Sequence, residues 1–260
     1  MATRFRAPVA MATGLAVAFG PVAAIAQADP PAAVVADPSL HLQGVQNARD
    51  IGGYRTTDGR IVRTGLVYRT GQLNNATPED LAALTDRRVR SVHDLRTVFE
   101  RALGPDRLPA GATAHWADVI GQASPEVIAT TLTGGDGLYR AFVTAPGANE
   151  AFASVLRDII GADGAVLFHC TAGKDRTGWT AAVLLTLLGV DRTTVTEDYL
   201  LSNRFRNASE GDPLNGVQES WLDAAFDQVS RTYGSFDAYV RDGLRLSDGD
   251  IAALRTRLLG

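Results

Sequence analysis

The sequence predicts an α/β fold in which a central, mostly parallel sheet is flanked by helices and is followed by a helix-rich C-terminal part. Two observations carry this prediction. Short apolar or alternating segments typical of strands lie between residues 61 and 168 and are interspersed with helical segments, and only helical patterns follow residue 193. Hydrophobic residues form 45% and charged residues 21% of the 260-residue chain, which is the composition of a globular protein with a full core.

The N-terminal segment has the order of features of a secretory signal peptide. Arg4 and Arg6 precede an uncharged run over 7–26, which ends in the A-x-A sequence AQA. We expect residues 1–28 to be removed on export to the periplasm, the cell envelope or the medium, and residues 29–260 to form a single domain. The alternative is a retained membrane anchor, because the uncharged run approaches the length that spans a bilayer.

The expected elements of this domain follow in order. Residues 61–68 (IVRTGLVY) contain the β-branched and aromatic residues of a strand. At 77–86 a threonine, a proline and two acidic residues precede an apolar run, which is typical of a helix N-terminus. Residues 89–95 alternate as a strand does, and 115–120 are a further candidate strand. Helices separated by Gly or Pro are predicted at 125–132, 138–144 and 149–160.

The second half of the domain begins with a buried strand. The short apolar run 165–168 (AVLF) is expected at the centre of a parallel sheet. Residues 180–189 (TAAVLLTLLG) are apolar on nearly every face, which predicts a helix packed against that sheet. The stretch between them, HCTAGKDRTG from His169 to Gly178, is therefore a strand-to-helix loop, where ligands bind in α/β folds. Further helices are predicted at 194–205, 217–229 and 250–259.

The loop from His169 to Gly178 holds the only cysteine and the only lysine of the chain, Cys170 and Lys174. A loop that closes onto a helix N-terminus presents backbone N–H groups and the positive end of the helix dipole to an anion. This field favours thiolate over thiol at Cys170, and the planar guanidinium of Arg176 can hold two phosphate oxygens. The alternative is a structural, buried cysteine. A Walker-type nucleotide loop is excluded, because Asp175 follows the lysine where Ser or Thr is required.

HCTAGKDRTG resembles the HCxxGxxRTG phosphate-binding loop of cysteine-dependent protein tyrosine phosphatases. Its GKDRTG version resembles a secreted bacterial subgroup that acts on phosphotyrosine and often on phosphoinositides. The similarity covers about residue 45 to the C-terminus and is weakest over 121–160, where such enzymes can carry helices that shield the active site. Further similar segments are NARDIGGY at 47–54, HDLRTVFE at 93–100, EDYLLSN at 197–203 and YGSFDAYV at 233–240.

The resemblance implies a covalent mechanism. Cys170 would attack phosphorus, Arg176 would stabilise the transferred group, and water would then hydrolyse the cysteinyl-phosphate. Thr177 would donate its hydroxyl to the departing thiolate or cap the following helix, and one residue could fill both roles. The general acid would be Asp175, which lies in the loop, or Asp94, which could equally pair with a neighbouring arginine.

The remaining loop residues would bind substrate. His169 would orient the loop by hydrogen bonds. Lys174 resembles a lysine of phosphoinositide-handling phosphatases, where it can meet a second phosphate, and the alternative is a surface cation that balances the charge of Asp175. The residues expected to line the phosphate are His169, Thr171, Ala172, Gly173, Lys174 and Thr177.

The sequence thus predicts an exported phosphatase that hydrolyses protein phosphotyrosine, with phosphoinositides as the alternative substrate class. No cofactor or metal is expected, because this chemistry needs none and His93 and His115 lack the clustering of a metal site. A net charge of −4 argues against a nucleic-acid partner. The competing functions are a phosphate-binding module without turnover, which intact Cys170 and Arg176 disfavour, and a redox or sulfur-transfer role for Cys170, which would not need Arg176.

Overall fold

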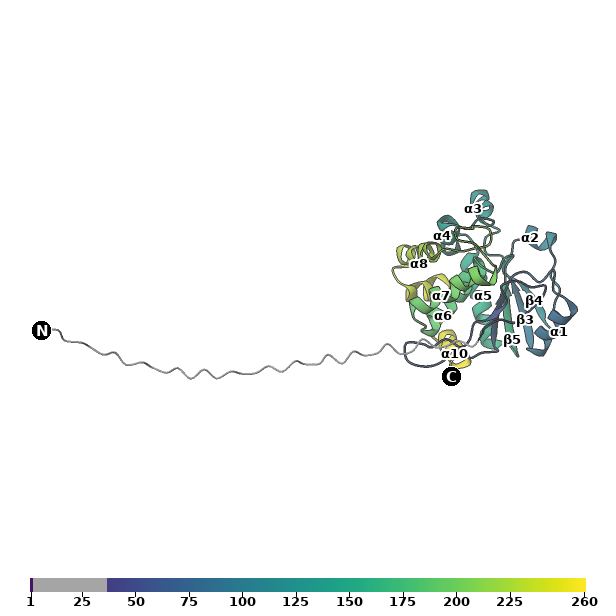
Figure 1. Cartoon of the computed structure of the whole chain (residues 1–260), viewed down its shortest axis with the longest axis horizontal. Helices are drawn as coiled ribbons and strands as arrows, with labels where there is room; N and C mark the ends of the chain where they lie inside the picture. The colour runs from purple at the N-terminus through teal and green to yellow at the C-terminus, as the bar shows by residue number, and fades with distance from the viewer. Residues whose placement is uncertain (2–36) are drawn as a thin grey trace. The chain divides into compact units, whose positions relative to one another are not determined.

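The computed structural model of the chain describes Met1 and residues 37–260 (Figure 1). Most of the predicted signal peptide, together with its expected cleavage site, lies outside the described residues. Within the described part, no helix is both long and apolar enough to cross a membrane.

In residues 37–260 the strands form one five-stranded sheet with the order β1-β2-β5-β3-β4. Strands β2, β5, β3 and β4 are parallel, and only β1 pairs antiparallel, with β2. The sheet is therefore mostly parallel, as predicted. Its strands are β1 (Arg49–Asp50), β2 (Val67–Thr70), β3 (Val89–Asp94), β4 (Thr113–Trp116) and β5 (Ala165–His169).

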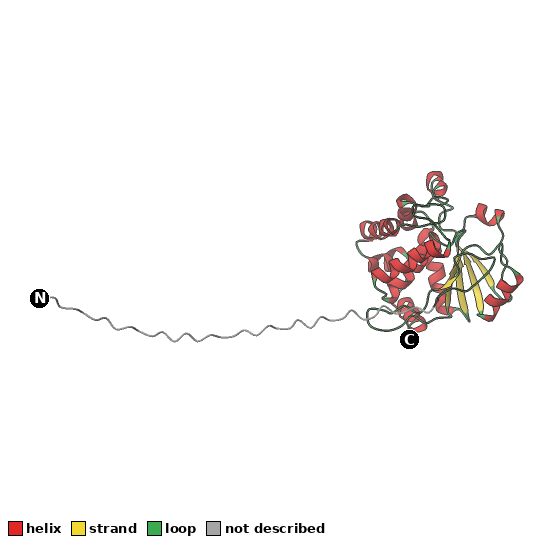
Figure 2. Cartoon of the chain, in the orientation of Figure 1, coloured by secondary structure: helices red, strands yellow, loops and turns green. Residues whose placement is uncertain are grey.

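Helices pack on the sheet, and Figure 2 shows most of them (red) on one side of the strands (yellow). The first five are α1 (Pro78–Asp86), α2 (Val98–Leu103), α3 (Pro125–Ala129), α4 (Asp136–Thr144) and α5 (Ala148–Gly161). After β5 come α6 (Arg176–Leu188), α7 (Arg192–Phe205), α8 (Glu219–Tyr233), α9 (Phe236–Ala238), the π-helical turn η1 (Tyr239–Gly243) and α10 (Asp248–Leu258).

The central strand β5 is buried on both faces, which explains its continuous apolar sequence. Val166 and Phe168 belong to the large core cluster formed with the helices of the C-terminal part. Leu167 belongs to a smaller cluster that includes Leu84 of α1. Helix α6 starts directly after the loop that follows β5 and is buried along almost its whole length, so the loop lies between two fixed elements.

The structure differs from the predicted elements at several places. The strand expected at 61–68 is wrong in position, because Gly65 adopts a φ of 80° and breaks it, and regular pairing begins only at Val67. The strand expected at 115–120 lies instead at 113–116, and the helix expected at 125–132 ends at Ala129. Strand β1 and helix α2 were not predicted.

Candidate active site

The loop from Cys170 to Asp175 connects the carboxyl end of β5 to the first turn of α6, as predicted. Cys170 is 1% exposed, and Gly173 to Thr177 are buried. Thr171 is exposed and Ala172 is half-buried. The loop therefore meets solvent at the residue that follows the cysteine.

Strand β2 and the segment that contains Asn47 hold Gly173 in place. Its φ is 69°, and a Cβ at this position would lie 2.4 Å from the carbonyl oxygen of Thr70. Asn47 Nδ2 and Arg69 Nη2 donate to the Gly173 carbonyl over 2.8 and 3.0 Å. Only glycine fits at this position. The two donors fix the position of the Gly173 carbonyl, and with it the distance between the loop and strand β2.

Two fully buried arginines stand behind the loop with one carboxylate between them. Asp198 of α7 lies 3.2 Å from Arg49 Nε and 2.7 Å from Arg69 Nη1, and it accepts a hydrogen bond from Tyr54. Burial raises the pKa of Asp198, but the charges of both arginines outweigh this and lower it. Burial and the charge of Arg69 lower the pKa of Arg49 to about 10. Two arginine charges thus face one carboxylate charge, so one positive charge of the cluster formed by Arg49, Arg69 and Asp198 is left uncompensated.

Arg176 is held by Glu100 of α2 through two parallel hydrogen bonds. Nη1 donates to Oε2 and Nη2 donates to Oε1, each over 2.7 Å. Thr171 Oγ1 also donates to Glu100 Oε1 over 2.6 Å, so the carboxylate joins both ends of the loop. Burial raises the pKa of Glu100, but the hydrogen bonds and charge of Arg176 hold it well below its usual range. The guanidinium is thereby fixed in orientation beside the loop.

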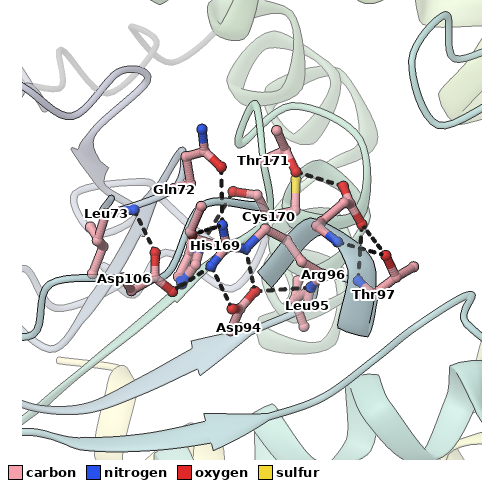
Figure 3. Close-up of polar contacts among 12 residues, drawn as sticks. Gln72, Leu73, Asp94, Leu95, Arg96, Thr97, Asp106, His169, Cys170 and Thr171 are labelled. Atoms are coloured by element: carbon pink, nitrogen blue, oxygen red, sulfur yellow. Dashed lines mark hydrogen bonds and ion pairs between the residues drawn. The ribbon is translucent and has the colours of Figure 1, made fainter. Parts of the chain in front are cut away.

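Asp94 does not face the cysteine as a free acid. Arg96 Nε and Nη2 donate to its two oxygens over 2.8 and 2.7 Å, and Arg96 Nη2 is also 2.7 Å from Asp106. His169 Nε2 lies 3.1 Å from Asp106 Oδ2, and Figure 3 shows these four residues turned toward one another. Burial raises the pKa of Asp106, but His169 and Arg96 outweigh this and lower it to about 2. This arrangement matches the alternative of Asp94 pairing with an arginine.

His169 contacts the loop as well as Asp106. Its Nδ1 lies 3.2 Å from the carbonyl oxygen of Cys170. The ring is fully buried. These contacts fit the expected role in orienting the loop.

Asp175 and Lys174 form a buried pair above the first turn of α6. Lys174 Nζ lies 3.1 and 3.2 Å from the two Asp175 oxygens, donates to the Pro213 carbonyl over 3.3 Å, and stands 5.4 Å from the centre of the Trp221 ring. Lys174 is 1% exposed. Tyr139 donates its hydroxyl to Asp175 Oδ1 over 3.0 Å. The geometry favours the alternative in which Lys174 balances Asp175, but the lysine is buried and not at the surface, where that alternative put it.

Thr177 does not cap α6. The helix begins at Arg176 and the capping position is Asp175, so the capping role considered for Thr177 is wrong. The Thr177 hydroxyl is buried and has no hydrogen-bond partner among the described residues. It is therefore free to donate to a thiolate in the loop.

The sequence interpretation that His93 and His115 do not cluster is wrong. Their rings stack with centroids 4.7 Å apart, and His93 Nε2 lies 2.9 Å from Asp158 Oδ2. The three residues offer ligand atoms within 4.8 Å of one another. The group arises because His93 and His115 occupy paired positions of parallel strands, and Asp158 Oδ2 lies within hydrogen-bond distance of both His93 Nε2 and Ser91 Oγ.

Five residues that position the loop were assigned no role from the sequence. Glu100 and Asp198 lie in HDLRTVFE and EDYLLSN, so the family resemblance marked their segments without identifying their contacts. Tyr139 lies in the region of weakest similarity and had no signal. The five are Asn47, Arg69, Glu100, Tyr139 and Asp198.

Comparison with known proteins places these features in a family. Residues 40–260 match the model of the tyrosine phosphatase family. The chain is 34% identical, over 91% of its length and 94% of the relative, to a Cupriavidus necator protein named provisionally as a tyrosine-protein phosphatase. It is 29% identical, over 84% of its length and 98% of the relative, to the triple specificity protein phosphatase PtpB of Mycobacterium tuberculosis.

A solved structure of P. aeruginosa TpbA in complex with pTyr also matches. It covers 76% of this chain and 88% of its own, with 18% sequence identity and a TM-score of 0.37. The score is too low for this likeness to support a further conclusion.

Proposed function

This chain belongs to the tyrosine phosphatase family, and from that premise we propose that it hydrolyses protein phosphotyrosine through a cysteinyl-phosphate on Cys170. The observation that carries the proposal is the pairing of a cysteine and a clamped arginine in one strand-to-helix loop. Arg176 is fixed by Glu100, and the N-terminus of α6 closes the same loop. Such a loop stabilises the charge of a transferred phosphoryl group.

The reaction proceeds in two displacements. In the first, the Cys170 thiolate attacks phosphorus, the bond from phosphorus to the tyrosine oxygen breaks, and a general acid protonates that oxygen. In the second, water attacks phosphorus, the sulfur–phosphorus bond breaks, and the same group accepts the proton of the water. Thr177 donates its free hydroxyl to the thiolate that departs. Arg176 binds phosphate oxygens in both steps.

Asp175 is the general acid of this proposal. It follows Lys174 in the loop itself, whereas the oxygens of Asp94 are both bound by Arg96. The hydroxyl of Tyr139 and the ammonium of Lys174 hold the Asp175 carboxylate in one orientation. A general acid must lie close to the leaving oxygen, and Asp175 belongs to the loop that would bind the phosphate, whereas Asp94 ends strand β3.

We propose phosphotyrosine, and not a phosphoinositide, as the substrate. The main support for the phosphoinositide alternative was that Lys174 could meet a second phosphate. In this structure the ammonium is buried and already contacts Asp175, Pro213 and Trp221. A second phosphate would have to displace these contacts.

Trapping of the phosphorylated enzyme tests this function. Wild-type protein mixed with a phosphotyrosine peptide and quenched in acid within milliseconds should carry one phosphate on the Cys170 peptide, detected by mass spectrometry. Cys170→Ser should carry none and show no turnover, yet still bind vanadate, because the backbone cradle persists. Turnover in the serine variant within tenfold of wild type would contradict the covalent mechanism.

We further propose that the protein is exported after removal of residues 1–28. The support is the order of basic residues, uncharged run and A-x-A sequence. N-terminal sequencing of protein from the periplasm and medium should give a start at or near Asp29. Recovery from membranes of a chain that starts at Met1 or Ala2 would indicate an anchor instead.

A further inference from the structure

The phosphate loop is accessible from one edge. Cys170 and residues 173–177 are buried, whereas Thr171 is exposed. Thr171 donates to Glu100, so helix α2 borders this edge. A larger molecule that brought a phosphate group to Cys170 from this edge would contact α2 and the surface next to Thr171.

Helix α2 exposes an apolar surface beside that edge. It has no buried residue, and Val98, Phe99 and Leu103 are 57%, 76% and 90% exposed. Trp116 is 77% exposed and its ring lies 5.1 Å from the Arg101 guanidinium of the same helix. We call Val98, Phe99, Leu103 and Trp116 the α2 patch. Four large apolar side chains exposed on or beside one six-residue helix exceed the singly exposed apolar residues of an ordinary protein surface, and such a concentration favours an interaction site.

An amide-lined hollow adjoins the same edge. A cavity of about 170 Å³ is lined by four residues with amide side chains, Gln46, Gln72, Asn74 and Asn75, and by Thr171, Gly44 and Gly71. It borders the end of α2, because Arg96 Nη1 joins Gln72 Oε1 to the carbonyl of Gly104, the residue that follows α2. Asn74 Oδ1 is buried and lacks a partner in the part of the chain that the structure describes. Side-chain amides both donate and accept hydrogen bonds, as the N–H and C=O groups of a peptide do.

We infer that the α2 patch and the amide hollow together bind the polypeptide that flanks the phosphotyrosine, and that an apolar residue next to the phosphotyrosine is preferred. The inference rests on the proposed function and names its substrate class. The hollow is uncharged, which suits a peptide backbone, and the α2 patch suits an apolar side chain. An anionic lipid surface fits less well, because such surfaces attract clustered cations and this chain has a net charge of −4.

Three substrates test the inference: a peptide with leucine on both sides of phosphotyrosine, the same peptide with serine, and phenyl phosphate. Each kcat/KM is divided by that for phenyl phosphate in the same variant, so that damage to the loop cancels. Wild type should prefer the leucine peptide roughly tenfold, as expected when an apolar side chain is partly buried. The double variant Phe99→Ser, Leu103→Ser should bring this preference close to one.

Two further variants complete the test. Leu132→Ser alters a leucine that is 72% exposed but lies outside the α2 patch, and it should keep the preference. Asn75→Ala should lower kcat/KM for both peptides relative to phenyl phosphate, since the hollow contacts the backbone and not the flanking side chain.

Each result that would contradict the inference can be told apart from a failure of the proposed function. A wild-type preference near one, or a preference that survives the double variant, would overturn the inference. Equilibrium sedimentation that shows a dimer disrupted by the double variant would assign the α2 patch to self-association. Binding of wild type, but not of the double variant, to vesicles of phosphatidylcholine and phosphatidylserine would assign it to a membrane. Failure to hydrolyse even phenyl phosphate would contradict the proposed function.

Discussion

Glu100 fixes Arg176 and Thr171 with one carboxylate, so it determines how the guanidinium is presented to a phosphate. The same residue should give the folded protein a pH-dependent stability. Its pKa is well below the ordinary value of 4.5, because the bonds from Arg176 outweigh the effect of burial. Above pH 4.5 this stabilisation is complete. As the pH falls below 4.5, the unfolded chain binds a proton that the folded chain does not, so the stabilisation declines.

We therefore expect Glu100→Gln to lower the free energy of unfolding by about 3 kcal/mol at pH 7, as expected when one partner of a largely buried ion pair is removed. The difference from wild type should shrink as the pH is lowered from 4.5. Denaturant unfolding of both proteins at pH 7 and below pH 4 measures it, with Glu126→Gln, an exposed glutamate of α3, as the control. A difference that does not change with pH would show that Glu100 contributes by packing alone.

Lys174 offers a second test at the scale of one residue. Because its ammonium pairs with Asp175, Lys174→Ala should disturb the general acid and lower kcat for every substrate. The ratio of kcat/KM for a multiply phosphorylated inositide to that for a phosphotyrosine peptide should stay within about twofold of wild type, since less than about 0.5 kcal/mol would separate the two substrates. A selective loss for the inositide of tenfold or more would place the ammonium on a second phosphate after all.

At the scale of elements, the loop depends on its close contact with strand β2. Gly173→Ala would place a Cβ 2.4 Å from the Thr70 carbonyl at a φ of 69°, so the loop must shift away from β2. A misplacement of this kind near the reacting atoms can lower kcat/KM by about a hundredfold. We expect such a loss with phenyl phosphate, accompanied by a lower free energy of unfolding.

Gly137→Ala is the matched control. Gly137 lies in α4 and is not among the residues of positive φ, and a Cβ added to it would meet no atom within 4 Å. Alanine is favoured over glycine inside a helix by about 1 kcal/mol, so this variant should be as active as wild type and no less stable. Equal activity of the two glycine variants would mean that the loop tolerates displacement from β2.

The elements that the sequence predicted well are those whose signals are local. Helix α1 begins where Thr77 and Asp80 form reciprocal caps, and β5 and α6 are continuous apolar segments on either side of the loop. The loop could therefore be placed, and Cys170 and Arg176 identified within it. Strand β2 was misplaced because the prediction ran the strand through Gly65, whose φ of 80° interrupts it.

The contacts of the loop could not be predicted because their partners are distant in sequence. Asp94 had two possible roles until the fold placed Arg96 on both of its oxygens. Lys174 became a buried cation only because Pro213 and Trp221 lie over it. Helix α2 is only six residues long, and its large apolar side chains are turned to solvent. The sequence therefore had no pattern of core-facing residues there to indicate a helix.

At the scale of the whole molecule, the segment that contains Asn47 and Arg49 and the C-terminal helix α7 meet on the buried side of the loop. Asn47 and Arg69 hold the Gly173 carbonyl, and Asp198 of α7 holds Arg49 and Arg69. The family resemblance of NARDIGGY and EDYLLSN thus has a physical basis, since the two segments build one support for the loop. The uncompensated positive charge of this cluster also lies on the side of the loop that faces away from solvent, where it favours a bound anion.

The chain has one cysteine, which determines how the whole molecule responds to oxidation. A thiolate that reacts with phosphorus also reacts with peroxide, and no second cysteine can form an internal disulfide with the resulting sulfenic acid. Hydrogen peroxide should therefore inactivate the enzyme, first reversibly and then permanently as the sulfur is oxidised further. Bound phosphate should slow inactivation, because it covers the sulfur from the one exposed edge of the loop at Thr171. Residual activity after timed exposure, with and without inorganic phosphate and before and after added thiol, measures both effects. Equal rates with and without phosphate would show that peroxide reaches Cys170 by another path than the substrate does.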